Sequence, residues 1–190
     1  MAIQFLTDHV LFQNESDNPQ TLVELGCGLG VPGMVLSALN PQQLNVILTE
    51  QETLVPQLQE NVTANFRQDD KHNMISVRPL SWSPDCIPDL LEDIPQSHPL
   101  HVVLNCDCIY EPLYGKDASL ALSATLLELA QQVPGLTIIT SVERRNQDGV
   151  DDFVVRIQES EYIESMELAL RNDDDRHHVI EIYIAKAKER

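Results

Sequence analysis

A glycine-rich turn directly after a short apolar run restricts the fold of this chain more than any other feature. Thr21–Leu25 (TLVEL) predicts a buried strand, and the glycine loop Gly26–Gly30 (GCGLG) follows it at once. Val31–Leu39 then predicts a helix, with Pro32 in the first turn, where no N–H donor is needed. Glycines allow a sharp turn and a close approach to a ligand, which in doubly wound sheets binds at the carboxyl ends of the strands. We therefore expect a ligand-binding strand–loop–helix unit.

Apolar runs and helical patterns alternate along the rest of the chain. The further strands are predicted at Leu44–Thr49, Met74–Val77, Leu100–Cys106, Leu136–Val142, Tyr162–Leu170 and His178–Ala185. The further helices are predicted at Thr53–Phe66, around Pro88–Leu91, and at Leu120–Gln131 and Val150–Gln158. Such alternation predicts parallel βαβ units, and two successive strands at the end predict one antiparallel strand. The expected fold class is α/β, a Rossmann-like seven-stranded mostly parallel sheet with a C-terminal antiparallel hairpin and helices on both faces.

Length and charge limit the number of domains and the kinds of partner. The chain has 190 residues, of which 43% are hydrophobic, so we expect residues 1–190 to form a single domain with a real core. Twelve basic against 30 acidic residues give a net charge of −18. This charge argues against nucleic acid and against an anionic membrane surface as partners. No long amphipathic seam remains for self-association, so we expect a monomer.

The cysteines and the N-terminus indicate the compartment. Cys27, Cys86, Cys106 and Cys108 match no zinc spacing, so we expect reduced thiols and no metal. The first residues are too polar for a signal peptide, and no apolar run approaches the roughly 20 residues that span a bilayer. We expect the protein in the cytoplasm and also in the nucleus.

The glycine loop is compatible with two kinds of nucleotide. Gly28, Gly30 and Gly33 satisfy the dinucleotide pattern G-x-G-x-x-G, and Glu50 follows twenty residues after Gly30. However, Gly26 follows the strand directly, which places Glu24 just ahead of the turn. A carboxylate there would repel a pyrophosphate but would attract the ammonium of a methionine group. Glu50, at the end of the next strand, could accept ribose hydroxyls in either case. The loop therefore favours a cofactor with a methionine moiety.

A second set of motifs resembles a known family. Asp107-Cys108-Ile109-Tyr110-Glu111-Pro112 (DCIYEP), after the predicted strand Leu100–Cys106, resembles the D/E-x-x-Y/F motif of the seven-β-strand protein-lysine methyltransferases of the methyltransferase-like group. Three further segments match that family, namely Leu80-Ser81-Trp82 (L-x-W), Asn61 with Asn65 (N-x-x-x-N), and Val142-Glu143-Arg144 after the fifth strand. The resemblance covers roughly residues 20 to 185.

The resemblance implies transfer of a methyl group from S-adenosyl-L-methionine to a lysine side chain of another protein, which the acidity of the chain suggests is basic. Asp107 and Tyr110 would face the methyl group and the incoming amine as the catalytic residues. The cofactor would be bound by Glu24, Gly26, Cys27, Gly28, Gly30, Glu50, Gln51, Ser81, Trp82 and Asp107. The family's N-terminal segment, which carries a tryptophan, is expected to be shortened here, because the chain starts within the predicted helix Met1–Phe12.

Structural roles and other functions remain open for the same residues. Asp107 could cap the turn after the strand, Tyr110 and Trp82 could be packing residues, and Arg144 could pair with a surface acid. The acceptor could also be a protein histidine or a small molecule. An Asn/Asp-Pro-Pro-Tyr/Phe loop typical of nucleic-acid amino-methylation is absent, since Cys108 and Ile109 stand where prolines would. A non-catalytic interaction module with a cofactor fold is the third reading.

Overall fold

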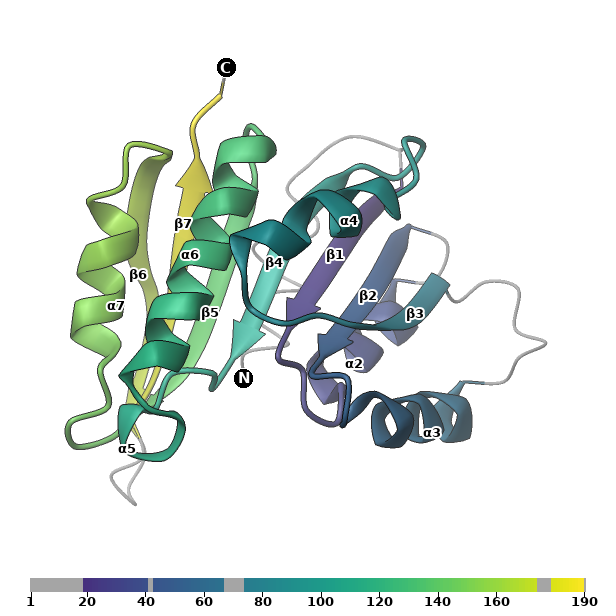
Figure 1. The fold of residues 1–190 in the computed structure, drawn as a ribbon, viewed down its shortest axis with the longest axis horizontal. Coiled ribbons are helices and arrows are strands. Elements are labelled where there is room, and N and C mark those ends of the chain that lie inside the picture. Colours follow the sequence, from purple (N-terminus) through teal and green to yellow (C-terminus); the bar gives the residue numbers. More distant parts are fainter. Residues whose placement is uncertain (1–18, 41–42, 67–73, 174–178, 190) are drawn as a thin grey trace. The chain divides into compact units, whose positions relative to one another are not determined.

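The computed structural model describes residues 19–40, 43–66, 74–173 and 179–189. The predicted N-terminal helix Met1–Phe12 lies outside these residues. Seven strands form a sheet in the order β3-β2-β1-β4-β5-β7-β6 (Figure 1). The pairs β1–β2, β2–β3 and β4–β5 are parallel, whereas β7 runs antiparallel to both β5 and β6. This arrangement, with helices around the sheet, confirms the predicted Rossmann-like α/β fold with its C-terminal antiparallel pair.

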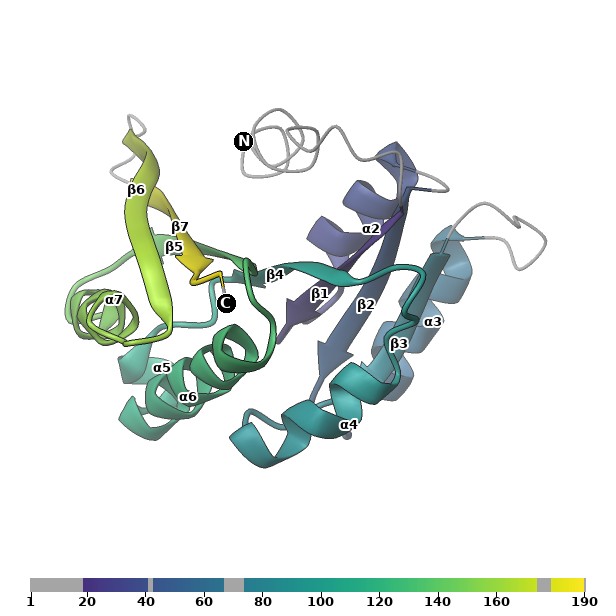
Figure 2. The same ribbon diagram turned by 90° about the horizontal axis from the view of Figure 1, so that it is seen from above.

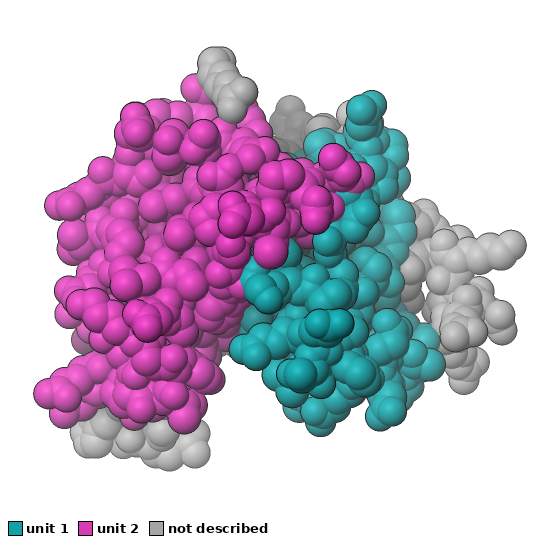
Figure 3. Space-filling model, viewed as in Figure 1, with its two compact units in different colours: residues 1–81, 93–101 teal, residues 82–92, 102–190 magenta. Residues whose placement is uncertain are grey.

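Contacts divide the chain into two compact units, which are described separately. Unit 1 comprises residues 1–81 and 93–101, and unit 2 comprises residues 82–92 and 102–190 (Figure 3). The expectation that residues 1–190 form one domain stays a prediction.

Unit 1 contains the predicted strand–loop–helix element around the glycine loop Gly26–Gly30. Its elements are β1 (Gln20–Leu25), α2 (Val31–Leu39), β2 (Leu44–Glu50), α3 (Val55–Asn65) and β3 (Met74–Pro79). The register pairs Leu25 with Thr49 and Glu50 with Pro79, so the three strands end at one edge. Val23, Val46 and Leu48 are almost completely buried, and helices α2 and α3 contact strands β2 and β3. The glycine loop therefore leaves β1 at an edge that rests on a rigid apolar core.

Unit 2 holds the rest of the chain. Its elements are η2 (Pro84–Cys86), α4 (Ile87–Glu92), β4 (Leu100–Cys106, whose first two residues belong to unit 1), α5 (Glu111–Tyr114), α6 (Lys116–Gln132), β5 (Thr137–Arg144), α7 (Val150–Gln158), β6 (Ile163–Asp173) and β7 (Val179–Ala187). Helices α6 and α7 lie side by side over β5, β7 and β6 (Figures 1 and 2). Phe153 of α7 is fully buried in this layer. The register pairs Cys106 of β4 with Ser141 of β5, which sets the segment after β4 beside the end of β5.

The structure adds two short helices that the sequence pattern did not predict, the 3-10 helix η2 and the α-helix α5. Helix α5 has four residues, too few for an apolar periodicity, and its Leu113 and Tyr114 are 67% and 52% exposed. Helix α6 begins at Lys116, whereas the sequence predicted a start at Leu120. The earlier start was missed because the first turn begins with exposed polar residues and carries no apolar stripe. Helix α5 begins at Glu111, within the DCIYEP motif, and α6 follows it; exposure there removes the signal on which helix prediction depends.

All four cysteines are free thiols, and Cys27 and Cys108 are buried. Among the described residues, no helix combines the length and the apolar character that crossing a bilayer requires.

Candidate functional site

In unit 1, two buried carboxylates hold the glycine loop. The Gly28 N–H donates to Oε2 of Glu50 over 2.8 Å, and the Gly33 N–H donates to Oε2 of Glu24, also over 2.8 Å. The Cys27 N–H donates to the Thr49 carbonyl over 3.1 Å, which continues the pairing of β1 with β2 into the loop. The path of the loop is therefore fixed by both strands that it adjoins.

Gly28 is the point at which the loop is open. Its φ is +56°, which side chains other than glycine rarely adopt, and a Cβ built there would meet no atom within 4 Å. Gly33, by contrast, is closed in, because a Cβ there would lie 2.5 Å from Leu48 Cδ2 and 2.6 Å from Glu24 Oε2. Helix α2 can thus approach the sheet closely at Gly33, while the backbone at Gly28 remains accessible to a ligand.

Glu24 is the most buried of the predicted ligands, with 1% of its surface exposed. Burial raises the pKa of its carboxyl to about 8; the Gly33 N–H lowers it, and the nearby Glu50 raises it further. Among the described residues, nothing donates a hydrogen bond to Glu24 Oε1. A buried acceptor without a donor costs free energy, so this oxygen would be satisfied by an ammonium or another donor.

The remaining predicted residues of unit 1 lie around the same loop. Glu50 Oε1 accepts the N–H of Gln51 over 2.8 Å, so both carboxylate oxygens of Glu50 are engaged. The side chain of Asn61, on α3, donates from Nδ2 to the Leu29 carbonyl over 2.6 Å and ties the far side of the loop to this helix. The structure thus brings together Glu24, Gly26, Cys27, Gly28, Gly30, Glu50 and Gln51.

In unit 2, Asp107 stands directly after β4 in an unusual backbone conformation. Its φ is +54°, and its N–H donates to the Ser141 carbonyl over 2.7 Å. Positive φ is uncommon outside glycine, although Asp tolerates it better than most residues, and such conformations cluster at functional sites. The surrounding structure therefore presents the Asp107 carboxylate at the carboxyl end of β4.

The partner of Asp107 is Arg145, a residue for which the sequence predicted no role. The Arg145 Nη1 and Nη2 atoms donate to Oδ1 and Oδ2 of Asp107, each over 2.8 Å, and Nη2 also pairs with Glu143. The guanidinium carbon lies 5.0 Å from the ring centre of Tyr110, within cation–π distance. Asp107 and Tyr110, predicted together, thus meet around one arginine.

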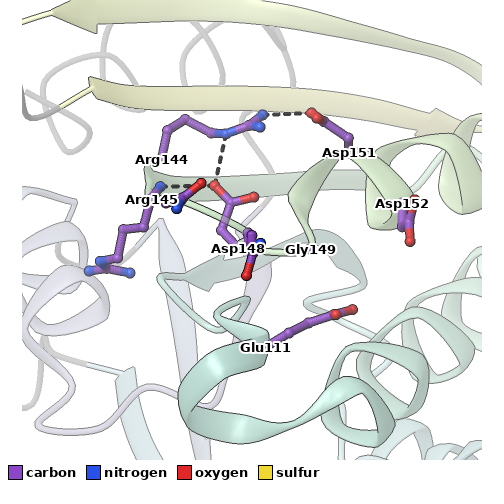
Figure 4. Close-up of a pocket in the computed structure, with 9 residues that line it drawn as sticks. Glu111, Arg144, Arg145, Asp148, Gly149, Asp151 and Asp152 are labelled. Atoms are coloured by element: carbon purple, nitrogen blue, oxygen red, sulfur yellow. Dashed lines mark hydrogen bonds and ion pairs between the residues drawn. The ribbon is translucent and has the colours of Figure 1, made fainter.

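Arg144 takes a separate path, although it is the next residue along the chain. It pairs with Asp148 and Asp151 (Figure 4), and its hydrogen bond lowers the pKa of Asp151. It also pairs with the buried Glu181. The expectation that Arg144 pairs with a surface acid is met by Asp151, which is 84% exposed. Strand β5 ends at Arg144, and Arg145, the first residue beyond it, is the one that pairs with Asp107.

The DCIYEP segment also contacts the loop before α7. The Glu111 N–H donates to the Asp148 carbonyl over 3.0 Å, and Gly149 has φ +84° where a Cβ would collide with the Glu111 side chain. Residues 111, 144–149, 151 and 152 line an open hollow of about 470 Å³ (Figure 4). A signal for this contact existed in the sequence as the lone glycine before Val150, but nothing local linked it to Glu111.

Ser81 is exposed and ends the first segment of unit 1, whereas Trp82 is half-buried and begins the first segment of unit 2. Their predicted place against an adenine stays a prediction. Within the residues that the structure describes, no group of three or more His, Cys, Asp or Glu side chains is arranged to hold a metal.

Two curated proteins are similar to part of the chain. Secreted RxLR effector protein 48 of Plasmopara viticola is 37% identical over 136 residues, covering 68% of this chain and 66% of that protein. Diaminohydroxyphosphoribosylamino-pyrimidine deaminase of Schizosaccharomyces pombe is 27% identical over 159 residues, covering 83% of this chain and 35% of that protein. The chain therefore spans less than two thirds of either relative.

Several solved structures share the fold at low sequence identity. The CurJ carbon methyltransferase has a TM-score of 0.65 at 14% identity and is matched over 93% of this chain and 50% of its own. An O-methyltransferase family protein from Burkholderia thailandensis also has a TM-score of 0.65, at 11% identity, over 99% and 55%. CrArsM, an arsenic(III) S-adenosylmethionine methyltransferase from Chlamydomonas reinhardtii, has a TM-score of 0.59 at 13% identity, over 90% and 64%.

These likenesses establish the Rossmann-like methyltransferase fold. A family model described as lysine methyltransferase matches residues 1–169, which is most of the chain. The chain therefore belongs to the lysine methyltransferase family.

Proposed function

We propose that this chain transfers a methyl group from S-adenosyl-L-methionine to a lysine side chain of a basic protein. Family membership supports methyl transfer, and the observation that carries the choice of acceptor is Asp107. This acid is held at positive φ after β4, and the arginine that pairs with it, Arg145, also lies over the ring of Tyr110. A carboxylate next to an aromatic ring suits a cationic or amine group of a substrate.

The groups around the glycine loop fit the cofactor. Gly28 leaves open space for a ligand to approach the backbone, and Glu24 Oε1 is a buried acceptor that an amino-acid ammonium would satisfy. Glu50 ends β2 with a carboxylate that can accept further hydrogen bonds from ribose hydroxyls, because each oxygen has two lone pairs. We assign Glu24, Glu50 and the backbone of Gly26, Gly28 and Gly30 to binding.

The cofactor, when bound, supplies a methyl group on a positively charged sulfur. The chain's own residues then have to position an uncharged amine nitrogen in line with that group, since positioning provides most of the rate of such displacements. Asp107 orients the amine through a hydrogen bond, and Tyr110 forms a wall against which the lysine stem lies. The amine proton is released to water before transfer, so no residue needs to act as a general base.

Charge supports a basic protein as the acceptor. The net charge is −18, and acidic side chains steer cationic partners toward a site in a manner that salt screens. We assign the partner to basic proteins for this reason, and nucleic acid is disfavoured by the same charge.

Calorimetric titration with S-adenosyl-L-methionine tests the cofactor half of the proposal. Glu50→Gln keeps an oxygen for the Gly28 N–H but loses the charge, so binding is expected to weaken about tenfold or more. Glu52→Gln, at an exposed position, is the matched control and should bind as the wild type does. Absence of binding by the wild type at millimolar cofactor would sink the enzyme proposal.

A tritiated-methyl assay on separate cytoplasmic and nuclear extracts tests the acceptor. The labelled protein and residue are then identified by mass spectrometry, and a labelled lysine is the expected result. A labelled histidine or small molecule would overturn the lysine assignment but keep the methyltransferase. Cofactor binding without any transfer would instead indicate an interaction module.

A further inference from the structure

The side chains of Asp107, Glu143 and Tyr110, named here the cation site, all contact the guanidinium of Arg145 in unit 2. Two carboxylates and one ring surround a single guanidinium, that of Arg145. Carboxylates paired with an aromatic face are the groups that bind ammonium ions elsewhere in proteins. The cation site thus has the chemistry of a substrate-ammonium site, but a residue of the same chain fills it.

The contacts of Arg145 are of the kind that exchange. Its side chain is 29% exposed, that of Glu143 is 30% exposed and that of Asp107 is 47% exposed, so water and other cations can reach both partners of each ion pair. Arg144, in contrast, holds Glu181, whose side chain is only 2% exposed. Arg145 is therefore the arginine whose partners another cation can reach.

The backbone of Arg145 is anchored independently of its side chain. Its N–H donates to Oδ2 of Asp148 over 2.9 Å, and Asp148 in turn is held by Arg144 (Figure 4). The guanidinium can therefore swing away from Asp107 by side-chain rotation alone, while the loop after β5 keeps its place. In Figure 4 the Arg145 side chain points away from that of Arg144, toward the side opposite Asp151.

We propose that Arg145 is a tethered competitor for the substrate ammonium. The lysine arrives protonated, displaces the guanidinium from Asp107 and Tyr110, and takes its place, so that one cation replaces another and the charge of the site is conserved. Arg145 thereby holds Asp107 in position when no substrate is bound. A substrate cation then binds only if its affinity for the cation site exceeds that of the Arg145 guanidinium. This inference rests on the proposed function, because it names the group that regulates the same site.

Butylammonium, a lysine side-chain analogue, tests the exchange directly, with affinity read by NMR titration of the full chain. Arg145→Gln removes the competitor and is expected to tighten butylammonium binding about threefold to thirtyfold, given the usual strength of exposed ion pairs and cation–π contacts. Combining it with Asp107→Asn should abolish the gain. Butanol, the neutral analogue, should bind neither protein measurably.

The matched control is Arg171→Gln, which removes one positive charge from unit 2 at a side chain that pairs with Glu181 and not with Asp107. Its affinity for butylammonium should stay at the wild-type value. This control shows whether the loss of one positive charge is enough to change the affinity, or whether the guanidinium has to be removed from Asp107 itself. If Arg145→Gln binds butylammonium as weakly as the wild type, or more weakly, Arg145 only supports the loop and the inference is wrong.

The wild-type protein gives a second measurement that needs no variant to fold. Titration with butylammonium should shift the Arg145 Nε–Hε NMR signal toward that of a free arginine, and an unmoved signal at saturation would overturn the exchange. S-adenosyl-L-methionine is absent from these titrations. Loss of cofactor binding would therefore refute the proposed function alone, whereas an unmoved Arg145 signal in a cofactor-binding protein would refute this inference alone.

Discussion

Glu24 and Asp107 are both acids at the carboxyl end of a parallel strand, yet their surroundings differ in every respect. Glu24 is 1% exposed, has a pKa raised to about 8 by burial, and keeps one oxygen without a donor among the described residues. The Asp107 side chain is 47% exposed and has both oxygens paired with Arg145. Glu24 is thus shielded from water with one oxygen lacking a hydrogen-bond donor among the described residues, whereas Asp107 is exposed to water with both oxygens hydrogen-bonded.

The difference shows that position on the sheet does not by itself set the chemistry of an acid. Glu24 lies within β1, under the close approach of α2 at Gly33, so water is excluded from it. Asp107 lies one residue beyond β4, and its side chain is exposed to solvent. A buried acid stores free energy that a cationic ligand can release, whereas an exposed acid exchanges partners readily.

The largest expected effect comes from removing the charge of the exposed acid. Asp107→Asn should lower methyl transfer to a confirmed substrate about 100- to 1000-fold, because the amine loses the group that orients it. Asn tolerates positive φ as well as Asp does, so thermal unfolding should change little.

Asp117→Asn is the control for this variant, since Asp117 is exposed in the first turn of α6. It should retain wild-type transfer. Equal rates for Asp107→Asn and the wild type would remove Asp107 from the catalytic residues and leave it as a turn residue.

The next effect concerns the pH dependence of stability set by the buried acid. The folded pKa of Glu24 is raised from 4.5 to about 8, so folded protein keeps a proton that unfolded chain loses between these values. Its contribution to stability is therefore complete below about pH 4.5 and is lost as pH rises toward 8. Glu24→Gln lacks this loss, and its free energy of unfolding relative to wild type should rise by up to about 1.4 kcal/mol per pH unit.

Urea unfolding at pH 5, 6, 7 and 8 measures this difference. Glu52→Gln removes an exposed carboxyl and should keep the wild-type slope. If Glu24→Gln and the wild type give parallel curves, the Glu24 carboxyl is accessible to water, and the contrast with Asp107 disappears.

The smallest expected effect is a difference in stability between alanine variants at two glycines, the closed-in Gly33 and the open Gly28. Alanine in a helix normally stabilises relative to glycine, but at Gly33 its Cβ would press on the buried Leu48 and Glu24. Gly33→Ala should therefore destabilise by about 1–3 kcal/mol. Gly28→Ala meets open space and should cost only the strain of a positive φ, about 1 kcal/mol. A thermal midpoint lower for Gly28→Ala than for Gly33→Ala would contradict this packing.

Most of the fold could be predicted because burial leaves a local pattern. Strand β4 was predicted at its observed bounds, Leu100–Cys106, since a buried strand is a continuous apolar run that needs no partner to be seen. Helix α2 likewise begins and ends as predicted. The four residues of α5 were missed, because an exposed helix of that length has no apolar stripe.

The site could be predicted only as far as its residues stand at strand ends. Glu24 and Glu50 were named from their places near the ends of two predicted strands, and Asp107 from the resemblance of DCIYEP to a family motif. The structure places Glu24 next to the last residue of β1, Glu50 at the end of β2 and Asp107 directly after β4. The part played by Arg145 was missed, because two adjacent arginines look alike in a sequence. Nothing local reveals which of them faces Asp107.

The sequence by itself determined where strands and helices occur along the chain, the turn at Gly26–Gly30, and the acids at or directly after the strand ends. These features depend on periodicities of two and 3.6 residues, which are local. Only the tertiary structure decided that Arg145, 38 residues from Asp107, would pair with it, and that Glu24 would be sealed beneath Gly33. Such contacts depend on strand register and helix packing, which no local pattern encodes.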